Sequence, residues 1–364
     1  MCGVVMKNDL TVNNLLKIYE TEISKNVKNK KSLYNFEVNK MQNITNILSM
    51  LNNGDIGHKK YNIFLIYEPK CRLVMSLSVS DKIINHFVTR YSLEKNLTKY
   101  LDPRNIATRK NMGTDYGIKL VRKYLNKLKK DNDMFYILKI DISKYFYSID
   151  HNVLKSELKD KLDDYEYDII SKIIDTTNEE YVNKEIFHNI SKHNLDLVLY
   201  YFGKGLPIGN MTSQFLSIFY LHKLDHFIVH DLKLKYYVRY MDDFIIMDKD
   251  LNKLKQAREI IIEKLEQEYK LKVNTKKTFI VNSKIGFAFL GYVFKVLDNK
   301  TIIKIKRCNL EKIKKRVKKV NYLFKNKKIS HYKAFCTIMT YSNCYKYSNN
   351  IRVLKLIDKY FYEK

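Results

Sequence analysis

Asp242 and Asp243 stand side by side between two apolar, β-prone runs, in the stretch YVRYMDDFIIM at residues 237–247. Adjacent aspartates often do no more than mark a polar turn. Here, however, short strands expected at Tyr236–Tyr240 and Phe244–Met247 would hold the pair rigidly at a hairpin turn. Partly buried carboxylates repel each other unless a cation neutralises them, and Mg²⁺ favours one or two carboxylates plus substrate phosphates. The pair therefore indicates a magnesium site that acts on phosphates.

A third carboxylate, Asp141, follows the β-type run FYILKI at residues 135–140. On its own, an aspartate at a strand end could equally cap a following helix. If Asp141 and Asp242 lie on adjacent strands, they form the carboxylate set of a two-metal site, which activates an attacking oxygen and steadies a leaving phosphate. Together with the charge of the chain, this set favours phosphoryl transfer on nucleic acid.

The chain is strongly basic, with 67 Lys and Arg against 39 Asp and Glu and a net charge of +28. Residues 301–364 alone carry 18 basic and 3 acidic side chains. Such a balance points to a polyanionic partner, either nucleic acid or an anionic membrane surface. No apolar run approaches the roughly 20 residues that span a bilayer, and the start, MCGVVMKNDL, lacks the apolar segment of a signal peptide. We therefore expect a nucleic-acid partner, no membrane and a cytoplasmic location.

The length of 364 residues, 45% of them hydrophobic, suits two or three subdomains rather than a disordered chain. The cysteines show neither the paired spacing of a metal site nor a disulfide framework. They are Cys2, Cys71, Cys308, Cys336 and Cys344. These features indicate a reduced protein with little room for flexible linkers.

The elements expected around the aspartates mix helices and strands without a regular βαβ series, which is an α+β pattern. Residues 1–58 are mainly helical, and a β-hairpin flanks the turn EPK at 68–70. A helix is expected from about Asp81, with Ser80 as its N-cap. Residues 151–200 are largely helical, and a Gly-rich turn then leads into an apolar helix.

Two later helices are predicted by apolar residues at three- and four-residue spacing. The first is marked by Leu254, Ala257, Ile261 and Leu265. The second is marked by Leu310, Ile313, Val317, Val320 and Phe324, with lysines on its other face. Such a basic face is expected to follow nucleic-acid phosphates, so binding should weaken steeply with salt.

The motif YMDD inside a β-hairpin resembles the catalytic motif of reverse transcriptases, and the other blocks stand in that family's order. LKIDISKYFYSIDH resembles the block of the first catalytic aspartate, and GLPIGNMTSQ the template- and nucleotide-binding turn and helix. LKVNTKKT resembles the following lysine block, and FLGYVF the primer-grip hairpin. Upstream, EPKCRLVMS, SDKIINH and IATRKNMGT resemble fingers blocks of bacterial reverse transcriptases. A YxDD motif alone is weak, but five ordered blocks, from about Tyr61 to Phe294, are specific.

This resemblance implies an α+β right-hand polymerase fold with fingers, a palm that holds an antiparallel sheet and the YMDD hairpin, and a short helical thumb. The domains expected are a helical extension at 1–58, fingers at 59–130, a palm at 131–295 and a basic helical thumb at 296–364. The helical insert at 151–200 belongs in part to the fingers. The implied activity is RNA-directed DNA polymerisation with an RNA template, a DNA or RNA primer and dNTPs.

The resemblance also implies two bound Mg²⁺ ions, for which Mn²⁺ is an expected substitute. Their ligands would be the carboxylates of Asp141, Asp242 and Asp243 and the carbonyl of Ile142. Lys277 matches the lysine proposed to protonate the pyrophosphate leaving group, with Lys276 as the competing choice.

Four residues match groups that bind the incoming nucleotide. Phe146, five residues after Asp141, matches the aromatic gate that excludes a ribose 2′-hydroxyl, and a core aromatic is its alternative. Lys70 and Arg72 lie on the fingers hairpin, where the family grips the triphosphate, and a solvated strand end is their alternative. Arg109 is expected to help there.

The turn before the apolar helix is expected to contact the nascent base pair through Ile208 and Gly209, where a glycine would let the backbone approach closely. The residues expected at the template and primer are Gly205, Pro207, Ser213, Gln214, Leu290, Gly291 and Tyr292. Many relatives have Gln-Gly in this turn and end the block in Ser-Pro. This chain has Ile208-Gly209 and ends in Ser213-Gln214.

That departure resembles the reverse transcriptases of diversity-generating retroelements and related bacterial groups that include phage-defence enzymes. In the former, an apolar residue at the Ile208 position accompanies error-prone copying of template adenines, and such enzymes work with a structured non-coding RNA and a small basic accessory protein. Phage-defence and retron enzymes are the alternatives, and the priming mode and oligomeric state stay open.

A basic RNA-binding protein with a silent polymerase site is the alternative outside the enzymes. The three aspartates and the gate residue argue against it. An RNA polymerase is a further alternative, against which Phe146 and YMDD argue.

Overall fold

A computed structural model describes residues 5–58, 60–67, 71–131, 134–193, 198–297, 300–342 and 347–348. The chain divides into two compact units. The first unit consists of Met1–Thr108, Ile142–Lys233 and Ile260–Asn274, and the second of Arg109–Asp141, Leu234–Glu259 and Thr275–Lys364. The turn at 68–70, with Lys70, lies outside the described residues.

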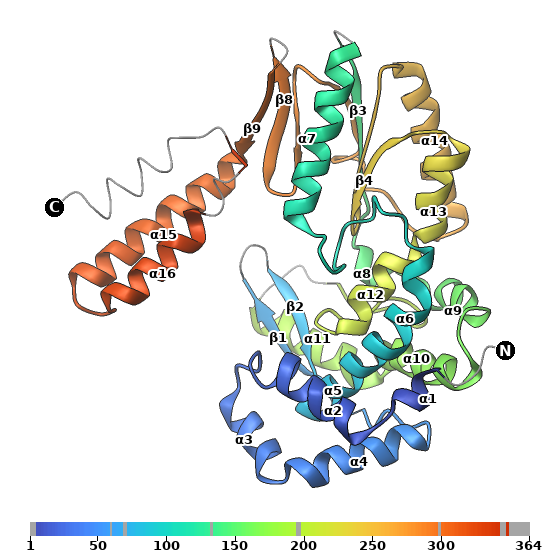
Figure 1. The fold of residues 1–364 in the computed structure, drawn as a ribbon, viewed down its shortest axis with the longest axis vertical. Helices are drawn as coiled ribbons and strands as arrows, with labels where there is room; N and C mark the ends of the chain where they lie inside the picture. The colour runs from blue at the N-terminus through green and yellow to red at the C-terminus, as the bar shows by residue number, and fades with distance from the viewer. Residues whose placement is uncertain are drawn as a thin grey trace. The chain divides into compact units, whose positions relative to one another are not determined.

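The second unit is built on a four-stranded antiparallel sheet in the order β4-β5-β3-β6. Its strands are β3 (Tyr136–Asp141), β4 (Tyr236–Tyr240), β5 (Asp243–Asp248) and β6 (Phe279–Asn282). The two central strands, β3 and β5, bury nearly all of their residues. Helix α7 (Thr114–Asp131) packs against β4, where the rings of Tyr124 and Tyr236 meet edge-on (Figure 1). The predicted strand before Asp141 and the YMDD hairpin are thereby confirmed.

The β4–β5 hairpin turns through only two residues, Met241 and Asp242, because Tyr240 pairs with Asp243. Met241 has a left-handed φ of 56°, a conformation that two-residue hairpin turns usually give to glycine or asparagine. Arg239 is fully buried and donates a 3.1 Å hydrogen bond to the Met241 carbonyl. A buried cation therefore holds the strained turn in place.

A second antiparallel sheet of the same unit is followed by a pair of helices. The strands are β7 (Phe287–Phe289), β8 (Tyr292–Leu297) and β9 (Lys300–Ile305). The helices α15 (Arg307–Lys325) and α16 (His331–Ser342) lie side by side in Figure 1 and enclose a small core of Val320, Ala334 and Ile338. The predicted stripe of α15 is buried at Ile313, Val317 and Val320, while exposed lysines cover other positions of the helix.

The first unit begins with helices α1 (Val5–Asp9), α2 (Val12–Ile18), α3 (Lys30–Val38) and α4 (Lys40–Asn52). Of these, α2, α3 and α4 pack against α5 (Val79–Val88). The prediction that α5 starts near Asp81 with Ser80 as its N-cap is wrong by two residues. The cap is Ser78, whose hydroxyl accepts from the Asp81 N–H at 3.1 Å and donates to the Asp81 carboxylate at 2.7 Å.

The predicted hairpin around 68–70 is confirmed as β1 (Asn62–Ile66) and β2 (Arg72–Ser76). Its buried residues Leu73 and Met75 share a core with Val182 and Ile186 of helix α11 (Glu180–His193). The other α-helices are α6 (Glu94–Leu97), α8 (Tyr145–Ser148), α9 (His151–Lys159), α10 (Asp164–Asp175), α11 (Glu180–His193), α12 (Met211–Tyr220), α13 (His222–His226) and α14 (Leu251–Gln267). The spacing that predicts α14 is confirmed, because all four marked residues are buried.

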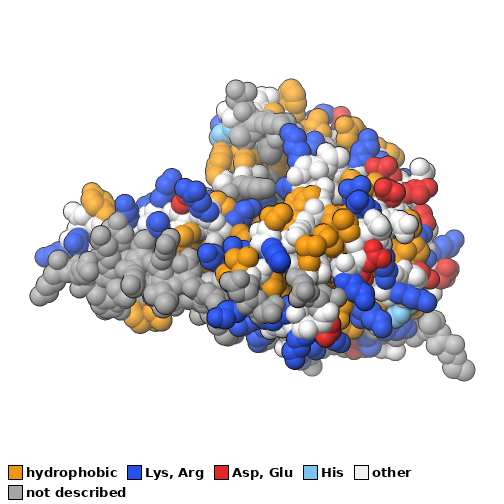
Figure 2. Space-filling view, turned by 90° about the horizontal axis from the view of Figure 1, so that it is seen from above, with side chains coloured by type: hydrophobic (Ala, Val, Ile, Leu, Met, Phe, Trp, Pro, Cys, Tyr) orange, Lys and Arg blue, Asp and Glu red, His pale blue; other side chains and the backbone are white. Residues whose placement is uncertain are grey.

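Lys and Arg side chains outnumber Asp and Glu side chains on the face shown in Figure 2. On this face the basic side chains are thus spread widely rather than gathered in one patch. No described helix is both long enough and apolar enough to cross a membrane.

Glu166 of α10 is a buried carboxylate, 1% exposed, in the first unit. It accepts hydrogen bonds from the Met6 N–H at 3.2 Å and from the Asn96 amide at 2.7 Å. Burial raises its pKa from 4.5 to about 7, and the Asp163 carboxylate adds to the rise. The unfolded chain therefore releases this proton first, so the folded state loses stability as the pH rises through that window.

We predict that Glu166→Gln, which keeps a hydrogen-bonding oxygen and cannot ionise, flattens this pH dependence. The free energy of unfolding near pH 8 should rise by roughly 2 kcal/mol, and the change near pH 5 should be small. Urea unfolding of both proteins at the two pH values measures the difference. Glu180→Gln, at an exposed position, is the matched control. An identical pH dependence in wild type and Glu166→Gln would contradict the prediction.

Candidate active site

The strand register brings two of the three aspartates face to face. Asp141, at the end of β3, pairs with Asp243, at the start of β5. Asp242 precedes Asp243 in the two-residue turn. Asp141 is 8% exposed, and the other two are partly buried. The predicted carboxylate set therefore lies at one end of the central strands.

Each of the paired carboxylates already faces a lysine amine. Lys277 Nζ donates to both oxygens of Asp141 at 2.9 Å, and 48% of its side chain is exposed. Lys139 Nζ donates to Asp243 Oδ2 at 3.0 Å and to the Ala288 carbonyl at 2.7 Å. Only 10% of the Lys139 side chain is exposed. Lys277 can therefore swing into solvent, whereas Lys139 is fixed.

The Lys139 amine does not fully neutralise the negative charge around Asp243. Burial raises its pKa to about 6, the Lys139 amine opposes the rise, and the carboxylates of Asp141 and Asp242 add to it. Asp243 Oδ1 is buried and has no hydrogen-bond partner among the described residues. A divalent cation would satisfy that oxygen and offset the repulsion, and carboxylate oxygens are the ligands that Mg²⁺ prefers. The donor set therefore fits the predicted metal.

In the parts of the chain that the structure describes, no three carboxylate, histidine or cysteine side chains form a ready metal cage. This is compatible with Mg²⁺ chemistry, in which substrate phosphates and waters complete the shell around one or two carboxylates. Ile142, the predicted backbone ligand, has a buried side chain and forms a β-bridge with Val273.

Lys139 and Arg239 support the site and were not predicted from the sequence. Lys139 precedes Asp141 by two residues, so both side chains point to the same face of β3. A charged residue inside the apolar run FYILKI was the available signal. Arg239 gave the same signal in the sequence, because it is the one charged residue in the strand run YYVRY.

The hairpin predicted at FLGYVF is formed by β7 and β8, which turn through Leu290 and Gly291. Both residues have left-handed φ, 48° and 84°, as a tight hairpin of this type requires. Tyr292 is buried at the start of β8. Because Ala288 of β7 accepts a hydrogen bond from Lys139, the hairpin also helps to hold the amine against Asp243.

The predicted gate and turn belong to the first unit, where backbone hydrogen bonds join them. The Phe146 carbonyl accepts from the Leu206 N–H at 2.7 Å, and the Ile149 carbonyl accepts from the Gly205 N–H at 2.7 Å. The Phe146 side chain is partly buried. Gly205 has a φ of 89°, and a Cβ there would approach the Tyr200 ring to 2.5 Å. The turn is thus packed too tightly at Gly205 for any other residue.

Gly209 is packed against β2. The Ile208 carbonyl accepts from the Met75 N–H at 2.8 Å. Gly209 has a φ of 129°, and a Cβ there would lie 2.8 Å from the Met75 carbonyl oxygen. This contact within the protein accounts for the glycine, and its predicted approach to a base pair stays a prediction. Arg72 lies exposed at the start of β2.

The other predicted residues differ in exposure. Pro207 and Ser213 are buried, Gln214 and Arg109 are partly buried, and Lys276 is exposed. Arg109 belongs to the second unit.

Residues 58–294 match the family described as "Reverse transcriptase (RNA-dependent DNA polymerase)". This span includes the aspartates, Lys277, the turn before α12 and the turn between β7 and β8. The chain belongs to the reverse transcriptase family. With the antiparallel sheets and helices described above, this membership confirms the predicted α+β right-hand polymerase fold.

Three telomerase structures are similar to this reverse transcriptase. Apo telomerase from Candida tropicalis, truncated from its C-terminal domain, is 16% identical with a TM-score of 0.44, over 68% of this chain and 55% of that chain. Telomerase from Candida albicans, with a TWJ fragment of telomeric RNA, is 16% identical with a TM-score of 0.45, over 72% and 49%. Another apo telomerase from Candida tropicalis is 14% identical with a TM-score of 0.46, over 68% and 48%. The chain spans about half the length of these telomerases, and no curated protein matches it.

We predict that Lys139→Met lowers the free energy of unfolding by about 2–4 kcal/mol, because it leaves Asp243 as a buried charge without its partner. In an Asp243→Asn background the loss should shrink by at least about 1 kcal/mol, since the neutral amide needs no cation. Urea unfolding of the two single variants, the double variant and the wild type measures this coupling.

Lys277→Met is the matched control for this cycle. Its half-exposed pair with Asp141 should contribute no more than about 1 kcal/mol. Additive effects of Lys139→Met and Asp243→Asn would show that the two side chains do not depend on each other.

Proposed function

We propose that this chain is an RNA-directed DNA polymerase that makes cDNA on an RNA template by two-metal nucleotidyl transfer. The observation that supports the proposal most is the pairing of Asp141 with Asp243 across the central strands, beside Asp242 in the turn. Asp141, Asp242, Asp243 and the Ile142 carbonyl would hold two Mg²⁺ ions, or Mn²⁺ in their place. When bound, such ions supply Lewis acidity that activates a primer 3′-hydroxyl and offsets charge on the leaving pyrophosphate.

Lys277 is the proposed proton donor to the leaving group. Its amine lies on Asp141, at 2.9 Å from both oxygens, and its half-exposed side chain can turn toward a substrate. The ammonium would give a proton from Nζ to a pyrophosphate oxygen as the bond to the departing group breaks. Lys276 is exposed and has no hydrogen bond or ion pair to a described residue, which favours Lys277.

The remaining predicted residues receive roles in binding. Lys70, Arg72 and Arg109 would grip the triphosphate, and Phe146 would exclude a ribose 2′-hydroxyl. These roles go with fingers at 59–130, a palm at 131–295, a thumb at 296–364 and an N-terminal extension at 1–58. The exposed lysines of α15 support a thumb that follows the phosphates of template and primer.

Within the family, we propose that the chain serves a diversity-generating retroelement, with a structured template RNA and a small basic accessory protein as partners. Ile208 supports this, because an apolar side chain there removes an amide that could bond to the nascent pair. A phage-defence or retron enzyme would use the same site, so these alternatives differ in template and fidelity rather than in chemistry. Magnesium dependence and a cytoplasmic location belong to the proposal.

We predict that Asp242→Ala reduces dNTP incorporation by at least about a hundredfold, because the site loses a metal ligand that stabilises the transition state. Extension of a DNA primer on an RNA template with Mg²⁺ and all four dNTPs measures the rate. Asp160→Ala, at an exposed position in the first unit, is the control and should leave the rate unchanged. Wild-type protein that binds the template and never extends it would favour the RNA-binding alternative.

We further predict that the wild type misincorporates more often opposite template adenine than opposite the other bases. Ile208→Gln should lower the adenine errors, because the new amide can hydrogen-bond at the nascent pair, while Ile208→Leu should keep them. Sequencing of cDNA made by the three proteins on one RNA template measures the error spectrum. Uniform errors in the wild type would count against the retroelement role and favour a defence or retron enzyme.

A further inference from the structure

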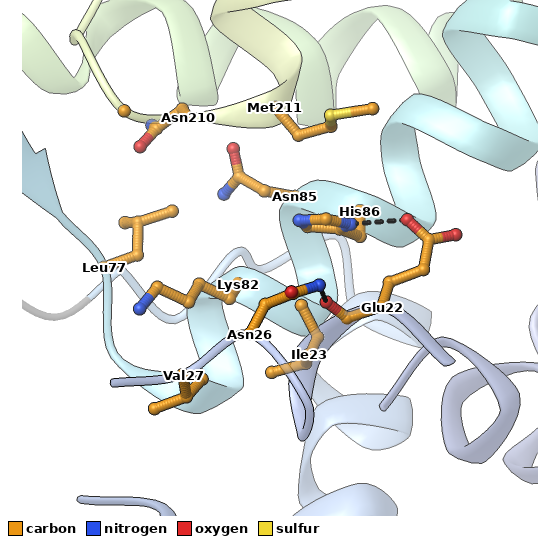
Figure 3. Close-up of a pocket in the computed structure, with 11 residues that line it drawn as sticks. Glu22, Ile23, Asn26, Val27, Leu77, Lys82, Asn85, His86, Asn210 and Met211 are labelled. Atoms are coloured by element: carbon orange, nitrogen blue, oxygen red, sulfur yellow. Dashed lines mark hydrogen bonds and ion pairs between the residues drawn. The ribbon is translucent and has the colours of Figure 1, made fainter. Parts of the chain in front are cut away.

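A small pocket in the first unit lies between the N-terminal helices and the start of α12 (Figure 3). Its volume is about 190 Å³. Its walls include Glu22, Asn26, Leu77, Lys82, Asn85 and Asn210. The proposed function uses none of these six side chains.

Two of the polar side chains on the pocket wall, those of Glu22 and Asn85, already have hydrogen-bond partners within the protein. Glu22 accepts from Arg90 Nε at 3.0 Å and pairs with His86 Nδ1 at 2.7 Å. The Asn85 oxygen accepts from the Thr212 hydroxyl at 2.7 Å, and its amide nitrogen donates to a backbone carbonyl one turn earlier at 3.0 Å. These contacts shape the pocket and neutralise the Glu22 carboxylate.

Two other polar groups on the wall have no partner among the described residues. Asn210 is 1% exposed, and its amide nitrogen donates to the Tyr61 hydroxyl at 2.9 Å, but Oδ1 accepts no hydrogen bond. The amine of half-buried Lys82 makes no hydrogen bond or ion pair, and burial lowers its pKa. In Figure 3, Asn210 and the tip of Lys82 flank Leu77 on one side of the pocket. The pocket therefore offers a buried acceptor and a cation.

These groups define the ligand, which must bring an anionic acceptor to Lys82 and a donor to Asn210. A ribonucleotide within a strand carries both, because its phosphate is an anionic acceptor and its 2′-hydroxyl is a donor that DNA lacks. The volume is below the roughly 300 Å³ of pockets that enclose whole drug-sized ligands. It suits one sugar-phosphate unit rather than a free nucleoside triphosphate, and Ile23 and Met211 offer apolar contact to the sugar.

We propose that this pocket binds the sugar-phosphate of one template nucleotide, with its phosphate at Lys82 and its 2′-hydroxyl at Asn210 Oδ1. The inference rests on the proposed function, because the pocket wall continues into Gly209 and the turn assigned to the template. It makes the N-terminal helices part of the template-binding surface and gives the chain a means to prefer RNA over DNA as template.

The test is equilibrium binding of the full chain to an RNA template annealed to a DNA primer, which fixes the register of the single-stranded overhang. Single 2′-deoxy substitutions along the overhang should weaken binding by about fivefold at one nucleotide, the effect of one lost hydrogen bond. Because the substitutions are made in the RNA and not in the protein, this measurement does not depend on whether a protein variant folds.

In the same assay, Lys82→Gln should weaken binding about five- to tenfold and reduce the slope of log K against log salt by about 0.7, as one lost phosphate contact requires. It should also abolish the effect of the sensitive 2′-deoxy position. Lys159→Gln, which removes the same charge from an exposed position of α9, should change binding little.

Insensitivity to every 2′-deoxy substitution, or equal effects of the two lysine variants, would overturn the proposal. Displacement of the template by adenosine monophosphate in wild type but not in Lys82→Gln would reveal a free-nucleotide site and overturn it as well. The assay uses no nucleotide incorporation. A wild type that fails to extend primers therefore counts against the proposed function, whereas the binding measurements with 2′-deoxy templates, lysine variants and adenosine monophosphate decide this inference.

Discussion

Two carboxylates face each other at one end of the two central strands, and the second unit is arranged to tolerate their repulsion. Like charges directly opposite on paired strands destabilise a sheet, yet Asp141 and Asp243 are held there by apolar strands that cannot shift register without exposing their core faces. Two lysines offset this repulsion. Lys139 is buried and contacts Asp243, and Lys277 is half-exposed and contacts Asp141. The compensation is incomplete at Asp243, where one carboxylate oxygen has no hydrogen-bond partner among the described residues, and this is where a bound metal ion would stabilise the site most.

The same lysine ties the carboxylates to a second sheet. Lys139 donates to Asp243 and to the Ala288 carbonyl, so the β7–β8 hairpin and the end of β5 share one buried donor. Arg239 acts similarly within the β4–β5 turn, where it holds the Met241 carbonyl. Both cations are buried and each has fixed partners, so they preorganise the site before any substrate arrives.

Sequence patterns predicted the elements that depend on local order and missed the contacts that depend on tertiary packing. The YMDD hairpin, the strand before Asp141 and the apolar stripe of α14 follow from apolar periodicity. This periodicity depends only on residues a few positions apart, so it can be read directly from the sequence. Lys139 and Arg239 were missed because a lone cation in a strand shows its partner only once the strands pair. The N-cap of α5 was placed two residues late. Ser78 and Ser80 both carry a hydroxyl that could cap the helix, and only the backbone conformation shows that Ser78 is the cap.

The packing of the turn before α12 has a consequence for laboratory evolution of this protein. Gly205 and Gly209 have no space for a side chain, and Leu206, Pro207 and Asn210 are buried, so random substitution at these positions will mostly produce misfolded library members. Ile208 is the one residue between Gly205 and Asn210 that combines a side chain with partial exposure. A focused library that varies this single codon would therefore change the exposed surface of the turn while leaving its packed residues intact.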